Sequence, residues 1–219
     1  MDLDDLVGDH LERGEPTGWF EPLYAAAIPR SPRVPWARGA PHPAVVDWLD
    51  DPPVRLPGSR VAVVGCGLGD DAAHLAVRGF AVTAIDVAPT ALRWAARRFR
   101  TAPVNWRRGD VLAPDDDLRG AFDLVVEVHT VPWLPGVVRD AAMSGVAGLV
   151  APGGAALVVT ELATSAEAGS SLTGPPWPQA PSELATYRAA GLTRLTLEHA
   201  EAGAAASIEV RTTWQRPVA

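Results

Sequence analysis

Short apolar runs alternate with amphipathic stretches between about residues 60 and 160. The run Val61–Val64 ends in a glycine-rich turn, which is typical of a buried parallel strand. The same pattern predicts strands at about residues 61–64, 81–85, 104–108, 122–128 and 155–160. Helices are expected at about residues 70–78, 89–99 and 136–150. Because strand and helix alternate, the sequence predicts an α/β fold with a parallel sheet.

The pattern changes after residue 160. A stretch rich in Ser, Gly and Pro (165–181) precedes one predicted helix at 182–190. Two predicted strands, at 192–198 and 207–214, then follow with no helix between them. Parallel neighbours need a crossover connection, so we expect these two strands to form an antiparallel hairpin. The whole pattern predicts a doubly wound, seven-stranded sheet, mostly parallel, whose last strand is antiparallel.

The first 58 residues are rich in proline and in aromatic residues. Proline breaks long helices, so we expect short helical pieces joined by extended segments. Disordered segments are poor in aromatic residues, which indicates that this arm packs onto the rest of the chain. The aromatic residues of the arm are Trp19, Phe20, Tyr24, Trp36 and Trp48.

Composition narrows the possible functions. The 219 residues carry 19 Lys+Arg against 26 Asp+Glu, a formal charge of −7, which does not supply the basic footprint of a nucleic-acid binder. All the cations are arginines, and the missing lysine excludes P-loop ATPases and Schiff-base enzymes. The single cysteine, Cys66, excludes a disulfide framework and a Cys-rich zinc site, and we expect no metal site.

Length and hydropathy indicate one domain with one sizeable core, since 47% of the residues are hydrophobic. No charge-free apolar run reaches the length of a membrane span, and the acidic start Met1–Asp5 is unlike a signal peptide. We therefore expect a cytoplasmic protein with no membrane partner. The oligomeric state stays open.

A glycine-rich turn follows the first predicted strand, with the spacing Gly65-x-Gly67-x-Gly69. Glycines let the backbone approach a ligand closely, and the start of the next helix offers free N–H groups. Asp86 ends the second strand, where a carboxylate can accept both ribose hydroxyls of an adenosine. The alternative is a tight turn with an ordinary acid at a helix start, but the strand–loop–helix–strand context favours a nucleotide-like ligand.

The position after this turn distinguishes two kinds of cofactor. A dinucleotide site of the form G-x-G-x-x-G would place glycine at position 70, whereas this chain has Asp70 and Asp71. Two carboxylates would repel a pyrophosphate and would favour a ligand with an ammonium or sulfonium cation. The sequence therefore favours S-adenosylmethionine over NAD.

Five segments resemble, in order and spacing, the motifs of class I S-adenosylmethionine-dependent methyltransferases. The resemblance covers about residues 60–160, and the family commonly has an acid where this chain has Val63. The thiopurine and halide/thiol branch is similar over residues 19–43 and 61–71, and it also lacks that acid. The segments are Val61–Asp71, Ala84–Asp86, Gly109–Val111, Phe122–Glu127 and Leu149–Gly154.

The resemblance implies a methyltransferase acting on a small molecule, with S-adenosylhomocysteine as the second product. It divides the single domain of residues 1–219 into a cap arm (1–58), a cofactor-binding half (60–160) and a closing region with a substrate loop (161–219). The residues it assigns to the cofactor are Tyr24, Trp36, Gly65, Cys66, Gly67, Gly69, Asp71, Asp86, Val87, Asp110, Val111 and Glu127.

Two residues at the end of the fourth strand are candidates for acid–base chemistry. Glu127 and His129 lie two positions apart, so both point to one face if the strand continues. Either can act as general base for an O–H, N–H or S–H acceptor. The alternative is that Glu127 pairs with an arginine and His129 caps the loop.

The substrate side is expected to consist of aromatic residues and one histidine. Rigid Pro/Trp loops place Trp133 and Trp177 over a pocket or over a core, and the pocket is the expectation here. Trp19 joins them from the arm. His42, between two prolines, either faces the site or is exposed and inert.

Two other classes of function stay open. One is a protein that holds the cofactor without methyl transfer, in a regulatory or pericyclic role. The other is an NAD-type oxidoreductase. The identity of the acceptor and its accepting atom does not follow from the sequence.

Overall fold

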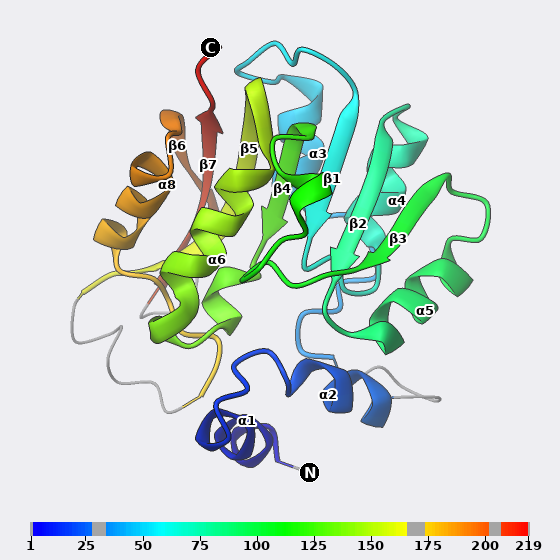
Figure 1. Cartoon of the computed structure of the whole chain (residues 1–219), viewed down its shortest axis with the longest axis vertical. Helices are drawn as coiled ribbons and strands as arrows, with labels where there is room; N and C mark the ends of the chain where they lie inside the picture. Colours follow the sequence, from blue (N-terminus) through cyan, green and yellow to red (C-terminus); the bar gives the residue numbers. More distant parts are fainter. Residues whose placement is uncertain (1, 28–33, 166–173, 202–206, 219) are drawn as a thin grey trace.

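A computed structural model describes residues 2–27, 34–165, 174–201 and 207–218. Its centre is a seven-stranded sheet with the order β3-β2-β1-β4-β5-β7-β6 (Figure 1). The strands are β1 (Arg60–Val64), β2 (Ala81–Asp86), β3 (Val104–Arg108), β4 (Phe122–Val128), β5 (Val150–Ala163), β6 (Thr193–Glu201) and β7 (Ser207–Gln215).

Strand direction follows the sequence prediction. β1, β2, β3, β4 and β5 pair in parallel, and β7 runs antiparallel between β5 and β6. Both the mostly parallel sheet and the antiparallel closing hairpin are therefore confirmed. Reversal of the last strand brings Val158 of β5 opposite Thr212 of β7.

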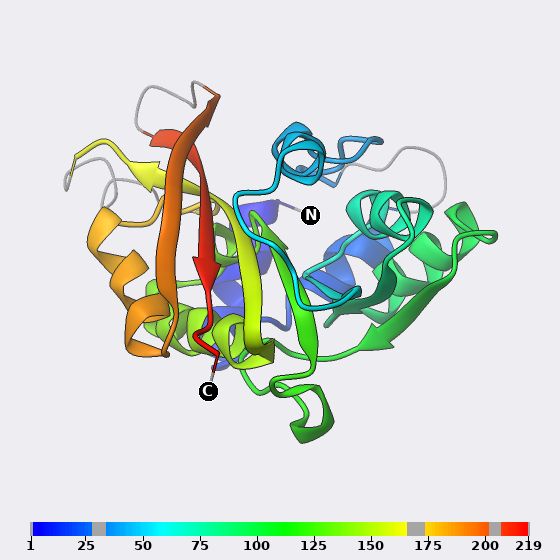
Figure 2. The same ribbon diagram turned by 90° about the horizontal axis from the view of Figure 1, so that it is seen from above.

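Helices cover both faces of the sheet, as Figures 1 and 2 show. On one face of the sheet, apolar residues of β1, β2 and β4 pack against Val45, Trp48 and Leu75 of the covering helices. The opposite core packs Met143, Tyr187 and Trp214 against the other side of the same strands. The helices on the first face are α3 (Pro43–Asp50), α4 (Asp70–Val77) and α5 (Pro89–Arg98). Those on the opposite face are α6 (Gly136–Leu149) and α8 (Ala185–Ala189).

Two boundaries differ from the sequence prediction. β5 begins at Val150 rather than near 155, because Val150 pairs with Phe122 and the backbone N–H of Gly153 donates to the carbonyl of Arg216. The helix expected at 182–190 divides into the 3-10 turn η3 (Pro181–Leu184) and α8.

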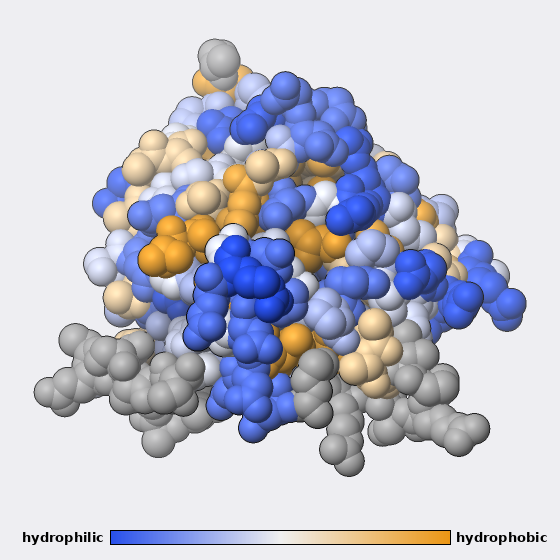
Figure 3. Space-filling model, turned by 60° about the horizontal axis from the view of Figure 1, so that its bottom comes forward, coloured by the Kyte–Doolittle hydropathy of each residue, from blue (hydrophilic) through white to orange (hydrophobic). Residues whose placement is uncertain are grey.

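The arm crosses the carboxyl ends of the parallel strands, at the bottom of Figure 1. It consists of α1 (Leu3–Glu12) and α2 (Phe20–Ala26), followed by an irregular segment that enters α3. Short helical pieces are thus confirmed for the described part of the arm. Ligands of open α/β sheets bind at these strand ends. Among the residues coloured in Figure 3, hydrophilic ones cover most of this face and apolar ones form scattered patches.

Candidate functional site

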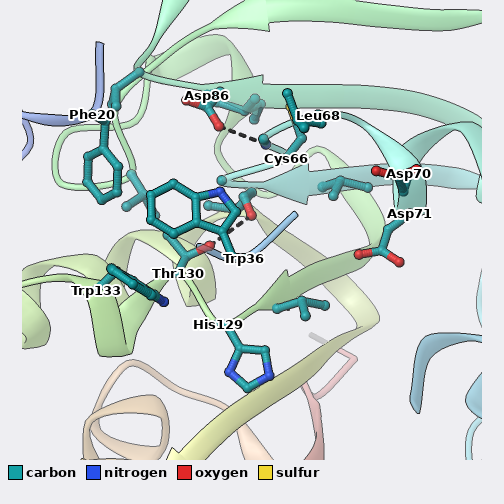
Figure 4. A pocket seen from close by; sticks show the side chains of 18 of the residues that line it. Phe20, Trp36, Cys66, Leu68, Asp70, Asp71, Asp86, His129, Thr130 and Trp133 are labelled. Carbon is teal, nitrogen blue, oxygen red and sulfur yellow. Dashed lines mark hydrogen bonds between the residues drawn. The ribbon is translucent and has the colours of Figure 1, made fainter. Parts of the chain in front are cut away.

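A cavity opens at the carboxyl ends of β1, β2 and β4, beneath the arm (Figure 4). Its volume is about 140 Å³, well above the roughly 10–15 Å³ that one water molecule needs on the same measure. The lining combines the glycine-rich turn, the ends of three strands, and side chains of the arm. The cavity therefore gathers segments that are far apart in the sequence.

The glycine-rich turn forms the floor of this cavity. Gly65, Gly67 and Gly69 have φ values of 60°, 50° and 83°, a left-handed conformation that glycine adopts without strain. A Cβ atom on Gly67 would lie 2.9 Å from the hydroxyl of Tyr24, and one on Gly65 would collide with Thr130. No side chain caps α4 behind Gly69, so the first N–H groups of this helix are available to a ligand.

Asp86 is held rigidly at the edge of the turn. Its carboxylate accepts hydrogen bonds from the backbone N–H of Gly67 at 2.8 Å and of Ala88 at 2.9 Å. Burial raises its pKa from 3.8 to about 6, although these hydrogen bonds act in the opposite direction. Each carboxylate oxygen can accept further hydrogen bonds, so Asp86 is placed to receive donors from a ligand.

The two acids after the turn have different surroundings. Asp70 forms a bidentate pair with Arg98, at 2.7 and 2.9 Å, which compensates its charge. No arginine among the described residues pairs with Asp71; its carboxylate accepts the backbone N–H of His42 at 2.7 Å, and burial raises its pKa. Both line the cavity, and Asp71 is the one that gains most from a cationic ligand.

Asp110, another residue expected to bind the cofactor, lies in the loop that follows β3. Asp110 accepts the backbone N–H of Leu112 at 2.9 Å and the hydroxyl of Thr17 at 3.2 Å, so the arm is tied to this loop. Val87 and Val111 provide apolar surface beside it. The cofactor-binding residues expected from sequence line this cavity, apart from Gly69 and Glu127.

Aromatic rings form the roof. Trp36 lies at the centre, with its ring centroid 4.5 Å from that of Trp133 and 5.9 Å from that of Phe20 (Figure 4). Trp19 is fully buried behind these rings and does not line the cavity, and Trp177 also packs behind them. Two of the four tryptophans expected at the pocket therefore support its wall, and Phe20 takes a place that the sequence did not indicate.

Glu127 lies behind the cavity wall. Its side chain is fully buried, and its Oε1 accepts the backbone N–H groups of Thr130 at 2.6 Å and Val131 at 3.1 Å. Burial raises its pKa from 4.5 to about 7. The expectation that Glu127 and His129 share a face is wrong, because His129 has φ 53° and the strand does not continue through it. Glu127 thus fixes the turn that carries His129 and lacks contact with the cavity.

His129 lines the cavity and pairs with a residue far along the chain. Its Nε2 lies 2.7 Å from Oε2 of Glu209, which belongs to β7. His42 completes the group: it is 4% exposed, and its Nε2 lies 3.5 Å from the same oxygen. The alternative of an exposed, inert His42 is therefore wrong. Glu209 carried no sequence signal, because only the reversed last strand brings it to this end of the sheet.

These three residues also form a candidate metal site in the described part of the chain, since their donor atoms lie within 4.8 Å of one another. The hydrogen bonding of His42 argues against metal binding. Its Nδ1 accepts the backbone N–H of Ala44, so the neutral ring carries its proton on Nε2. Metal binding at Nε2 would move this proton to Nδ1 and break the hydrogen bond from Ala44, so the trio is better suited to holding protons.

Among the described residues, no helix has the length and apolarity needed to cross a bilayer. The cavity suits a nucleotide-like ligand, and the sheet ends in an antiparallel β7; both features can be compared with those of known proteins.

A protein-family profile described as a methyltransferase domain matches residues 61–154. An uncharacterized methyltransferase of Mycobacterium tuberculosis strain H37Rv is 36% identical over 135 residues, which is 62% of this chain. The alignment covers 65% of that relative, just under two thirds of its length.

Solved structures show the same fold. A protein from a study of the conversion of a disulfide bond into a thioacetal group during echinomycin biosynthesis has a TM-score of 0.72 at 23% identity, covering 92% of this chain and 93% of its own. The N-methyltransferase NodS of Bradyrhizobium japonicum WM9, in complex with S-adenosylhomocysteine, has a TM-score of 0.60 at 20% identity and covers 73% and 78%. The thiopurine branch is not singled out by these comparisons. Residues 61–154 therefore match a methyltransferase domain, and the fold is the one found in class I S-adenosylmethionine-dependent methyltransferases.

Proposed function

We propose that this protein transfers the methyl group of S-adenosylmethionine to a small-molecule acceptor. The observation that carries this proposal is the continuity of one cavity from Asp86 to His129. In Figure 4 these two side chains lie on opposite sides of the Trp36 indole. One end offers groups for a nucleoside and the other offers an imidazole, so cofactor and acceptor have adjacent places.

The residues present suit the cofactor. The left-handed turn at Gly65–Gly69 has no space for a Cβ beside Thr130, Tyr24 and Trp106, so its backbone stays open to a ligand. Asp86, at the edge of this turn, would accept the ribose hydroxyls. Asp110 and Val111 would hold the adenine, and Asp71 would hold the ammonium group, since this chain has Val63 where the family commonly has an acid. When bound, the cofactor supplies an electrophilic methyl group on a sulfonium.

The aromatic roof has two tasks in this proposal. Aromatic faces attract a sulfonium cation, and the rings of Phe20, Trp36 and Trp133 exclude water from the cavity. They also limit its size, because the arm crosses the strand ends where a macromolecule would have to enter. An acceptor that fits is small and at least partly apolar.

The test combines binding with product detection. Calorimetry is expected to show S-adenosylmethionine binding to the wild type and weaker binding to Asp86→Ala, by at least about 1.5 kcal/mol. Methyl-labelled cofactor with a panel of thiols, phenols and amines should give S-adenosylhomocysteine and a labelled acceptor. Tight binding without label transfer to any acceptor would favour a cofactor-holding role without methyl transfer. Tighter binding of NAD would contradict the proposal.

A further inference from the structure

Three ionisable side chains meet at the acceptor end of the cavity, each from a different part of the fold. His42 precedes α3, His129 follows β4, and Glu209 lies on β7. Oε2 of Glu209 lies 2.7 Å from Nε2 of His129 and 3.5 Å from Nε2 of His42. The two imidazole rings are 5.5 Å apart between centroids. The carboxylate therefore lies between two imidazoles.

The hydrogen bonds fix which nitrogen of each ring carries a proton. His42 accepts the backbone N–H of Ala44 at Nδ1, at 3.2 Å, so its Nε2 is protonated and faces Glu209. Glu209 is an acceptor when ionised, so the 2.7 Å contact requires that His129 also donates from Nε2. A neutral His129 then has its lone pair on Nδ1, and within the described residues the hydrogen bond of this ring is made by Nε2 and not by Nδ1.

The charges around the trio support this arrangement. Burial of Glu209 acts to raise its pKa, but the hydrogen bond from His129 and the nearby imidazole of His42 lower it well below the usual range. Burial acts to lower the pKa of His129, but Glu209 outweighs burial and raises it, with smaller effects from Glu127 and Glu161. A proton taken up by His129 is therefore stabilised by the carboxylate beside it.

We propose that His129 takes the proton of a weakly acidic O–H or S–H acceptor at Nδ1, and that Glu209 and His42 are positioning residues that orient its ring. This inference rests on the proposed function and specifies its acceptor class. In the proton-transfer step the acceptor's O–H or S–H bond breaks, and its electron pair stays on the oxygen or sulfur atom. The proton forms an N–H bond at Nδ1, and the resulting imidazolium faces the Glu209 carboxylate.

The arrangement resembles a nucleophile–base–orienter set in its geometry, in which a carboxylate holds one imidazole nitrogen and frees the other. Glu209→Gln removes the charge and retains the shape of the side chain. Glu198→Gln is the matched control, since Glu198 lies on the neighbouring strand of the same hairpin and pairs with Arg211 outside the cavity.

The primary experiment is nitrogen-15 NMR of the histidines in the whole protein, which needs no acceptor. The five histidines are assigned with His42→Gln and His129→Gln variants. Below neutral pH His129 should be charged, and above its pKa it should be the tautomer protonated at Nε2. Glu209→Gln should lower the pKa of His129 by at least about one unit, and Glu198→Gln should leave it unchanged. An unchanged pKa in Glu209→Gln, or a neutral ring protonated at Nδ1, would overturn the inference.

Two further measurements separate this inference from its alternatives. Titration of the wild type with Zn²⁺ should leave the His42 and His129 signals in place, whereas zinc binding at both rings would identify a metal site instead. Calorimetry with S-adenosylmethionine should give Glu209→Gln the wild-type affinity. If the wild type fails to bind this cofactor, the proposed function fails; if it binds and His129 does not respond to Glu209→Gln, only the present inference fails.

Discussion

The indole N–H of Trp36 donates a hydrogen bond to the hydroxyl of Tyr24 at 2.7 Å, directly over Gly67. Both side chains come from the arm, and burial raises the pKa of Tyr24 well above its usual range, so the hydroxyl stays protonated. The pair joins the arm to the glycine-rich turn. Closure of the cavity and the shape of its floor therefore depend on each other.

The first prediction concerns that contact. Gly67→Ala should destabilise the protein by about 1 kcal/mol or more through its positive φ, and should also displace Tyr24. We expect at least about a tenfold loss of cofactor affinity, which is 1.4 kcal/mol. Gly79→Ala is the control, because Gly79 has φ 92° but nothing lies within 4 Å of its Cβ position. Equal cofactor affinity in the two variants, measured by calorimetry, would contradict the proposed role of the contact.

A second prediction concerns pH. The ionised form of Asp86 accepts hydrogen bonds from a ribose, and its pKa in the free protein is raised to about 6. Affinity for S-adenosylmethionine should therefore fall as pH drops below 6, by at most about tenfold for each pH unit. Binding near pH 6 should release a proton, which calorimetry in buffers of different ionisation enthalpy measures.

Asp86→Asn provides the comparison for this pH dependence. The amide keeps an acceptor oxygen but does not titrate, so the variant should bind more weakly and lose the dependence around pH 6. Asp117→Asn should behave as the wild type, since Asp117 pairs with Arg107 outside the cavity. A pH dependence that persists in Asp86→Asn would show that another group, such as Asp71, is responsible.

The cofactor end of the site could be predicted from the sequence because it is local. Gly65, Gly67 and Gly69 stand together in the chain, and Asp86 ends the adjacent strand of a regular βαβ unit. Parallel pairing of β1 and β2 alone brings these residues to one edge of the sheet.

The acceptor end could not be predicted because it depends on non-local packing. Glu209 and His129 are 80 positions apart, and their contact requires the reversed β7 to lie beside β5. The direction of the His129 side chain depends on one backbone angle, its own φ of 53°, which strand periodicity does not indicate. Trp19 and Trp133 are both tryptophans in proline-rich segments, so the sequence does not distinguish them. Ring packing in three dimensions decides which of them reaches the cavity.

A third prediction concerns the buried carboxyl of Glu127. Its pKa in the folded protein is raised to about 7 from an ordinary value of 4.5, so the folded state binds the proton more tightly than the unfolded state. The free energy of unfolding of the wild type should therefore fall as pH rises from about 5 to 7, by roughly 1 kcal/mol per pH unit from this group. Glu127→Gln should remove that slope and should be relatively more stable at pH 8 than at pH 5.

Urea unfolding of both proteins at several pH values measures this difference. Glu198→Gln serves as control, because its side chain is partly exposed and pairs with Arg211. A difference between Glu127→Gln and the wild type that is constant with pH would contradict the raised pKa.

The last prediction distinguishes the wall of the cavity from its support. Trp133 lines the cavity and packs on Trp36, whereas Trp177 packs behind these rings and its backbone N–H donates to Pro132 at 2.7 Å. Trp133→Ala removes apolar surface that faces the acceptor, so kcat/KM for an acceptor found in the screen should fall by about tenfold or more. Its affinity for S-adenosylmethionine should change much less, because the glycine-rich turn and Asp86 are untouched. Trp177→Ala keeps the wall and its backbone hydrogen bond, and should retain most of the turnover. Equal losses of turnover in the two variants, at equal thermal stability, would show that Trp133 acts only through packing.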